Sequence, residues 1–335
     1  MPKTFRLQKE EPLLNIASYA RGGPRAASRL TPAQVEQIRR TVRRTPEAVV
    51  KVLPRSSNDL KAAGKHLDYV GRYGELDLEG DHGERLQGRI GKELLEDWDL
   101  DIDDVRRHGG LSAARGRNPP KLVHKLMFSM PPGTPPQKVL SAVRNFAREE
   151  FFGQHRYALV LHTDEPHPHV HLVLKAVSEQ GVRLNIKKAT LRHWRSQFAN
   201  HLRELGVAAN ATERAVRGES RSARKDGIYR ASLRGESTFM RTRGEAVARE
   251  LASSVVRAQP GKRSLLETRA GVVAGWKGVA DILVRSGEHG LAADVSRFSR
   301  ALNPPTTDRD LLAKELVAIP RSRLREPPTS TNAVR

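Results

Sequence analysis

Residues 157–175 read YALVLHTDEPHPHVHLVLK, and this stretch decides the fold. Alternate side chains of a β-strand share one face, so His169 and His171 point together while Val170 and Leu172 point into the core. The TDEPHP loop is short enough to return the chain as an antiparallel neighbour of the preceding strand. The stretch therefore predicts a β-hairpin within an antiparallel or mixed sheet.

The hairpin also predicts a cluster of histidines. His162 ends the first strand, so the antiparallel return places its ring beside those of His169 and His171. Three imidazoles from two adjacent strands form half of a coordination shell with open positions, which is typical of a catalytic metal site. His167 lies in the loop, where contact with a substrate is expected. Asp164 is interpreted either as a group that orients one imidazole or as an ordinary loop carboxylate.

Charge and composition narrow the class of partner. The chain has 59 Lys and Arg against 38 Asp and Glu, a formal net charge of +21, which favours a polyanionic partner such as nucleic acid. It has no cysteine, so disulfides and thiolate metal sites are excluded and a transition metal must be bound by His, Asp or Glu. No apolar run is long enough to cross a bilayer and no leader is recognisable, so a cytoplasmic protein without membrane insertion is expected.

Periodicity elsewhere predicts an α+β domain: a central antiparallel or mixed sheet that carries the histidine hairpin, with helices over one or both faces. Further strands are expected at 47–53, 122–130 and 182–186, and helices at 60–70, 90–98, 137–152 and 190–205. Thr31 and Pro32 suit the start of another helix, and Ser56 with Asp59 suits the cap of the helix at 60–70. The Gly-rich residues 74–88 are expected to form a loop.

Three regions are expected along the chain: an N-terminal extension over 1–45, the α+β domain over 46–210, and a basic, partly helical C-terminal region over 211–335. The first 30 residues suggest a loose arm, and the last residues a disordered end. Helices resume near 244–257 and 263–288. Before them lies a segment rich in arginine, either aligned with phosphates or a solvated linker.

The histidine hairpin resembles the third motif of relaxases, which are members of the HUH endonuclease superfamily. The segment His169-Val170-His171 matches the HUH unit, and His162 matches the third metal ligand of that family. The form H-x-D-x-x-H-P-H-x-H is similar in particular to relaxases related to the T-DNA border endonuclease of tumour-inducing plasmids. The resemblance covers about residues 47–215, while the extension over 1–45 departs from the family pattern.

A second resemblance concerns the nucleophile. Residues 67–76, LDYVGRYGEL, match a family segment of the form L-x-Y-L-x-R-x-G-x-L, with Tyr69 at the nucleophile position and Tyr73 in reserve. On a helix, Tyr69 lies about 140° from the centre of the apolar stripe and Tyr73 about 100°, so both can be exposed.

The resemblance implies a metal-dependent nuclease that nicks one strand at an origin of transfer and forms a 5′-phosphotyrosine. The family works with Mg²⁺ or Mn²⁺, while imidazole ligands also suit Zn²⁺ or Ni²⁺. Implied partners are single-stranded DNA at a nic site, accessory DNA-binding proteins and a type IV secretion coupling protein. The acceptor of the tyrosine proton stays open between Asp164, His167 and a metal-bound water. The residues expected to bind DNA are Arg72, Arg195, Arg214, Arg217, Arg221 and Arg224.

Three other functions stay open. A rolling-circle replication initiator of the HUH superfamily carries its tyrosine after the histidine motif, where Tyr229 is available. A metallohydrolase would use the histidines to activate water without covalent attachment to DNA. A basic DNA-binding accessory protein with a decayed site is the third interpretation.

Overall fold

The computed structural model describes residues 30–53, 59–102, 121–219, 226–253 and 259–318. They fall into two compact units, one holding Pro32–Thr212 and one that begins at Glu213. The expected N-terminal arm and the C-terminal end lie outside the described residues.

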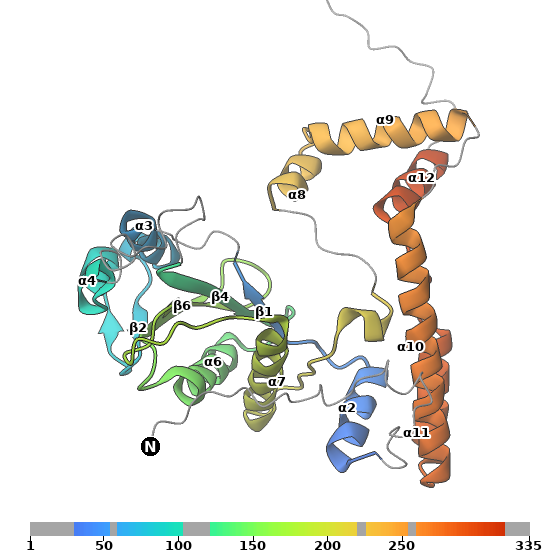
Figure 1. The fold of residues 1–335 in the computed structure, drawn as a ribbon, viewed down its shortest axis with the longest axis horizontal. Coiled ribbons are helices and arrows are strands. Elements are labelled where there is room, and N and C mark those ends of the chain that lie inside the picture. Colours follow the sequence, from blue (N-terminus) through green and yellow to red (C-terminus); the bar gives the residue numbers. More distant parts are fainter. Residues whose placement is uncertain (1–29, 54–58, 103–120, 220–225, 254–258, 319–335) are drawn as a thin grey trace, which may run out of the picture. The chain divides into compact units, whose positions relative to one another are not determined.

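The first unit is built on a six-stranded sheet with the strand order β1-β4-β6-β5-β2-β3 (Figure 1). All of its pairings are antiparallel, which confirms the predicted class of sheet. The strands are β1 (Val49–Val52), β2 (Leu78–Gly80), β3 (Arg85–Leu86), β4 (Val123–Ser129), β5 (Tyr157–His162) and β6 (His169–Lys175).

Helices cover both faces of this sheet (Figure 1). The covering helices are α3 (Leu60–Val70), α4 (Gly91–Asp97), α6 (Pro136–Phe151) and α7 (Lys188–Glu204), while α2 (Pro32–Val42) precedes β1 along the chain. Helices α6 and α7 pack on one face around Phe128, Phe146 and Phe198, and α3 and α4 pack on the other around Leu67 and Trp98.

The alternation of β6 divides its side chains between these two cores. Val170 and Leu172 belong to the α6–α7 core, while Val173 belongs to the α3–α4 core. His169 and His171 have the parity of Val173 and so face the side of α3. Helix α3, which carries Tyr69, and the side chains of His169 and His171 are thus on the same side of the sheet.

Helix starts follow the predicted chemistry. Helix α2 begins at Pro32, where the missing proline N–H leaves no hydrogen bond unmade. Helix α3 is capped by Asp59, whose carboxylate accepts a hydrogen bond from the Ala62 N–H at 2.7 Å. Ser56, expected to share this cap, lies outside the described residues.

The expectation of a loop over 74–88 is wrong. This stretch holds the hairpin of β2 and β3, and β2 pairs in turn with β5. Leu78 is buried in the α3–α4 core, and the Glu79 carboxylate accepts hydrogen bonds from Arg144 of α6 at 2.5 and 2.6 Å. These long-range contacts stabilise β2 and β3, which are only three and two residues long, and the short alternation from Glu75 to Glu79 was the signal that the sequence offered.

The expected strand at 182–186 is also not part of the sheet. It makes a single bridge, Val177 to Arg183, just beyond the end of β6. A tight turn at Gly181, whose φ is +77°, precedes it, and α7 follows at Lys188, which leaves too few residues for a full strand.

The end of the first unit is tied back to its beginning. Glu47 and Asn210 form a parallel bridge, and the Ala48 N–H donates to the Asn210 carbonyl at 2.9 Å. The Glu47 carboxylate accepts hydrogen bonds from the Thr212 N–H at 2.8 Å and from its hydroxyl at 2.6 Å. Residues beyond α7 therefore stabilise the strand β1 that follows Glu47.

The second unit is helical, as predicted for the C-terminal region. Its elements are η3 (Arg214–Arg217), α8 (Asp226–Leu233), α9 (Thr238–Ala252), α10 (Pro260–Arg285), α11 (His289–Arg300) and α12 (Asp308–Ala318). Trp276 of α10 is buried against Phe298 of α11, and its indole N–H donates to the Val216 carbonyl at 2.9 Å. Among the described residues, no helix is both long and apolar enough to span a membrane.

Candidate active site

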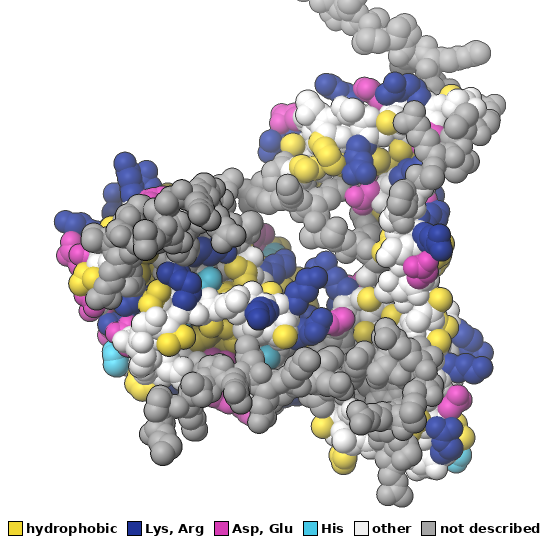
Figure 2. Space-filling view, viewed as in Figure 1, with side chains coloured by type: hydrophobic (Ala, Val, Ile, Leu, Met, Phe, Trp, Pro, Cys, Tyr) yellow, Lys and Arg dark blue, Asp and Glu magenta, His cyan; other side chains and the backbone are white. Residues whose placement is uncertain are grey.

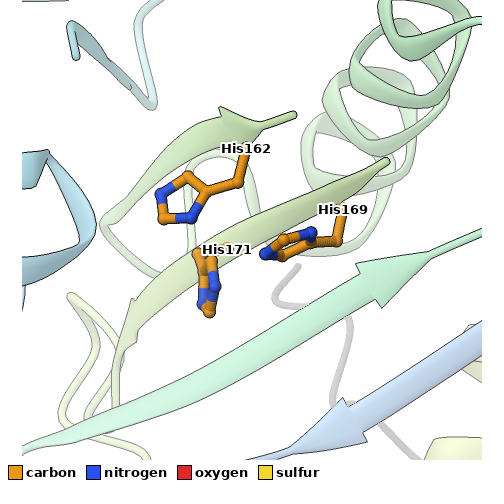
Figure 3. Close-up of side chains that lie close together, drawn as sticks. All are labelled: His162, His169 and His171. Atoms are coloured by element: carbon orange, nitrogen blue, oxygen red, sulfur yellow. The ribbon is translucent and has the colours of Figure 1, made fainter. Parts of the chain in front are cut away.

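The predicted histidine cluster is present at the end of the hairpin. His162 and His169 are direct cross-strand partners, and His171 follows two residues along β6. One ring nitrogen from each of the three lies within 4.8 Å of the others, and the rings point toward one another in Figure 3. The ring centroids are 4.7–5.2 Å apart.

Backbone carbonyls orient two of these rings. The Nε2 of His162 donates to the Val70 carbonyl at 2.7 Å, and the Nδ1 of His169 donates to the His167 carbonyl at 3.2 Å. Because a carbonyl can only accept, the opposite nitrogen of each ring keeps its lone pair. The Nδ1 of His171 is buried without a hydrogen-bond partner among the described residues.

The surroundings of His162 and His171 favour the neutral ring. Burial lowers the pKa of His171 to about 3, and the neighbouring His162 and His169 contribute in the same direction. Burial also lowers the pKa of His162, opposed by its bond to the Val70 carbonyl and assisted by the charge of Arg72. A neutral imidazole is the form that binds a metal ion, so these two residues have no proton to displace at neutral pH.

The three rings fit a divalent metal ion. Ligand atoms at about 2.1 Å from a tetrahedral ion lie about 3.4 Å from one another. Small rotations of the three rings would bring their nitrogens to this separation. Neutral nitrogen donors, two held by backbone carbonyls and one buried without a partner, match what such an ion needs. With three protein ligands, the remaining positions stay open for a substrate.

Arg72 links the cluster to the helix that carries the tyrosine. Its guanidinium lies 3.4 Å from the Nδ1 of His162, pairs with the Asp164 carboxylate, and lies 5.8 Å from the centre of the Tyr69 ring. Arg72 and Tyr73 adopt positive φ angles of 52° and 57° in the turn after α3. Non-glycine residues rarely adopt this conformation, which costs about 1–3 kcal/mol and is found preferentially at functional sites.

Asp164 contacts Arg72, whereas the sequence suggested contact with an imidazole as one of two interpretations. Slight burial acts to raise the pKa of Asp164, but the charge of Arg72 and a backbone hydrogen bond outweigh it and lower that pKa. The side chain is therefore an ionised carboxylate at neutral pH.

Both candidate tyrosines are exposed, Tyr69 on α3 and Tyr73 in the turn that follows it. Tyr69 is 50% exposed and Tyr73 is 58% exposed. Tyr69 precedes Val70, whose carbonyl binds His162, so the C-terminal end of α3 lies at the histidine cluster. Tyr73 lies one turn further on, with the Arg89 guanidinium 5.6 Å from the centre of its ring.

Other predicted residues are less closely connected to the cluster. His167 is half-buried, with its ring 5.7 Å from that of His169. Arg195 belongs to α7, which packs on the opposite face of the sheet from the histidines. Arg214 and Arg217 lie in η3 of the second unit, where Arg217 pairs with Glu219 at 3.4 Å. Arg221 and Arg224 lie outside the described residues.

Sequence reasoning missed two residues on this side of the sheet. His66 lies on α3, one turn before Tyr69, and burial lowers its pKa to about 4, with the charge of Lys125 acting in the same direction. Lys125 lies on β4 and is buried. The spacing of three residues between His66 and Tyr69 was the available signal, since such residues are neighbours on a helix surface.

Basic side chains are spread over the visible face of the molecule in Figure 2, with acidic side chains among them. This distribution agrees with the net charge of +21 and with a polyanionic partner.

Comparison with known proteins finds one similar family. Residues 89–207 match the family model "Relaxase: MobA/VirD2-like, nuclease domain", a range that includes all three clustered histidines and begins after Tyr69. No curated protein matches the chain. One solved structure, described as "Molecular Basis of Vancomycin Resistance Transfer in Staphylococcus aureus", is 14% identical over 50% of this chain and 98% of that chain. Its TM-score of 0.31 is too low to support an inference. Residues 89–207 are therefore similar to the MobA/VirD2-like relaxase nuclease domain.

Proposed function

We propose that this chain nicks one DNA strand at an origin of transfer and rejoins it through a 5′-phosphotyrosine on Tyr69, and so initiates conjugative transfer or mobilisation. The observation that carries the proposal is the contact of α3 with the histidine cluster: the Val70 carbonyl binds His162, and Arg72 contacts both His162 and the Tyr69 ring. The nucleophile is thus held beside the three proposed metal ligands, His162, His169 and His171.

The reaction exchanges one phosphodiester for another. The Tyr69 hydroxyl oxygen bonds to the phosphorus, the bond from phosphorus to the 3′ oxygen breaks, and that oxygen leaves as a 3′-hydroxyl after taking a proton. A divalent ion on the three imidazoles would neutralise charge on the scissile phosphate. Because the phosphotyrosine retains the energy of the original bond, the 3′-hydroxyl can attack it and rejoin the strand without ATP.

The phenol must lose its proton, since its ordinary pKa near 10 leaves it un-ionised at neutral pH. Asp164 is a weak base because its pKa is lowered, so we assign to it the role of holding Arg72. We assign acceptance of the proton to His167, which lies beside His169. The guanidinium of Arg72, over the Tyr69 ring, would stabilise the developing negative charge.

The cofactor and partners proposed follow the family. Mg²⁺ or Mn²⁺ is the proposed ion, with Zn²⁺ and Ni²⁺ as alternatives that imidazoles favour by affinity. The substrate is single-stranded DNA, contacted by Arg72, Arg195 and the arginines from 214 to 224. We propose that residues 46–210 form the catalytic domain. Accessory DNA-binding proteins and a type IV secretion coupling protein are further proposed partners. The protein would act in the bacterial cytoplasm and travel with the transferred strand.

The decisive experiment is incubation with single-stranded oligonucleotides from the intergenic region beside the gene, followed by denaturing electrophoresis. The expected result is a protein–DNA adduct that survives denaturant and is lost in Tyr69→Phe, which removes one exposed hydroxyl and no apolar contact. DNA binding should persist in this variant, and Tyr73→Phe is its matched control. Loss of the adduct in Tyr73→Phe alone would move the nucleophile one turn along the chain.

Two other outcomes would favour other functions. An adduct lost only in Tyr229→Phe would indicate a replication initiator, whose tyrosine follows the histidine motif; Tyr229 belongs to α8 of the second unit. Cleavage without any adduct would indicate a metallohydrolase, which the open positions of the histidine cluster also allow.

A further inference from the structure

The Tyr69 ring has two planar neighbours, one before it and one after it along the chain. The His66 imidazole, three residues before it, is stacked at 6.3 Å between ring centroids with an interplanar angle of 22°. Both residues belong to α3, where residues three apart are neighbours on the helix surface. The Arg72 guanidinium lies 5.8 Å from the ring centre, and Arg72 follows the end of α3, with a φ of +52°.

Both neighbours are fixed by the catalytic side of the sheet. Arg72 is held by the carboxylate of Asp164. The Nε2 of His66 is buried although its residue is only half-buried, and His66 interacts electrostatically with Lys125 of β4 and with His171 of β6. The imidazole therefore points from α3 toward the sheet, while Tyr69 stays exposed.

We propose that His66 is a positioning residue for the nucleophile: it restricts the Tyr69 ring to the orientation in which its hydroxyl meets the scissile phosphate. The proposal rests on the proposed role of Tyr69. An exposed tyrosine near the end of a helix has two free side-chain torsions, and a displacement of about 1 Å can cost about a hundredfold in rate. A stacked ring on one side and a guanidinium on the other remove most of this freedom.

The protonation state of His66 suits this role. Burial, with the charge of Lys125, lowers its pKa to about 4, so the ring is uncharged at neutral pH. A neutral ring does not repel the Arg72 guanidinium, the nearby Lys125 or a cation bound at His171. A charged group in the same place would do so.

The first test is kinetic. In His66→Ala we expect the single-turnover rate of adduct formation to fall about ten- to a hundredfold, with oligonucleotide affinity and metal affinity within twofold of the parent. His66→Phe retains a ring and should recover most of the rate. Lys65→Ala, an exposed neighbour on α3, is the matched control and should retain the parental rate.

The second test measures the ring directly, without activity. Fluorine NMR of protein labelled with 3-fluorotyrosine gives one resonance per tyrosine, and the resonance missing from Tyr69→Phe belongs to Tyr69. This resonance should shift and sharpen in His66→Ala, because the ring gains freedom, and should return toward the parent in His66→Phe.

A parental rate in His66→Ala, or an unchanged Tyr69 resonance, would each overturn the positioning role. Equal loss of rate in His66→Phe and His66→Ala, with both resonances displaced, would overturn it as well, because stacking would not be what matters. If the parent itself forms no adduct, the proposed function fails, and the NMR result alone still decides whether His66 orders the Tyr69 ring.

Discussion

Two imidazoles of the cluster are held by main-chain carbonyls, and these contacts bear on how single substitutions behave. His162 and His169 donate to main-chain carbonyls, while the Nδ1 of His171 lacks a partner among the described residues. His167 supports His169 through its carbonyl, which every residue has, and its ring is not required for that contact.

We therefore expect His162→Ala, His169→Ala and His171→Ala to lose metal affinity by more than about a hundredfold, since loss of a supporting contact alone costs about ten- to a hundredfold. Cleavage should be lost with it. His167→Ala should bind metal within a few-fold of the parent, yet cleave more slowly if its ring accepts the proton. Calorimetric titration with Mn²⁺ measures this, and a His167→Ala variant that fails to bind the ion would overturn the ligand assignment.

At the scale of an element, β4 holds a buried histidine that couples folding to pH. Strand β4 pairs with both β1 and β6, and His124 is 7% exposed within it. Burial lowers the pKa of His124 to about 4, and the charge of Lys121 contributes next. Arg183 and His155 also act to lower this pKa.

The unfolded chain, with a histidine pKa near 6.5, takes up this proton before the folded protein does. The free energy of unfolding should therefore fall as the pH drops from about 6.5 to about 4, by up to about 3 kcal/mol from this residue. Above about pH 7, His124 is neutral in both the folded and the unfolded chain, so it should not make the free energy of unfolding depend on pH. We expect His124→Leu to show a shallower loss of stability than the parent between pH 7 and 4.5 in urea denaturation. Parallel curves for the two proteins would contradict the assignment.

At the scale of the whole molecule, the charge of +21 predicts binding that depends strongly on salt. The arginines between 214 and 224 are the proposed backbone contacts. A truncation after Gly206 is a poor way to test them, because it also removes Asn210 and Thr212, which hold Glu47 and the strand that follows it. Substitution within the full chain keeps these contacts.

We expect Arg→Gln substitution at the four arginines of this segment to weaken binding to random single strands and to reduce the log–log salt slope by up to about 3, at roughly 0.7 per phosphate. Site preference should change little, because phosphate contacts carry no sequence information. The matched control neutralises four exposed arginines of the later helices: Arg241, Arg263, Arg285 and Arg300. Unchanged affinity and slope in the first variant would identify the segment as a linker.

The sequence alone determined the features that depend on neighbouring residues. Strand parity and a short loop bring His162 to His169 and His171, and apolar periodicity sets α3 and α6. Both patterns encode contacts over a few residues, where the backbone geometry leaves little choice.

Tertiary structure decided the contacts made across long stretches of chain. The hairpin of β2 and β3, strands of three and two residues, is stabilised by the pairing of β2 with β5 and by Arg144. Arg72 meets Asp164 across 92 residues, and Glu47 meets Thr212 across 165. Such pairs follow from the way the sheet and its helices pack, and no local pattern encodes which distant side chain will be the partner. The contact of α3 with the histidine cluster, through the Val70 carbonyl and His162, is of this second kind.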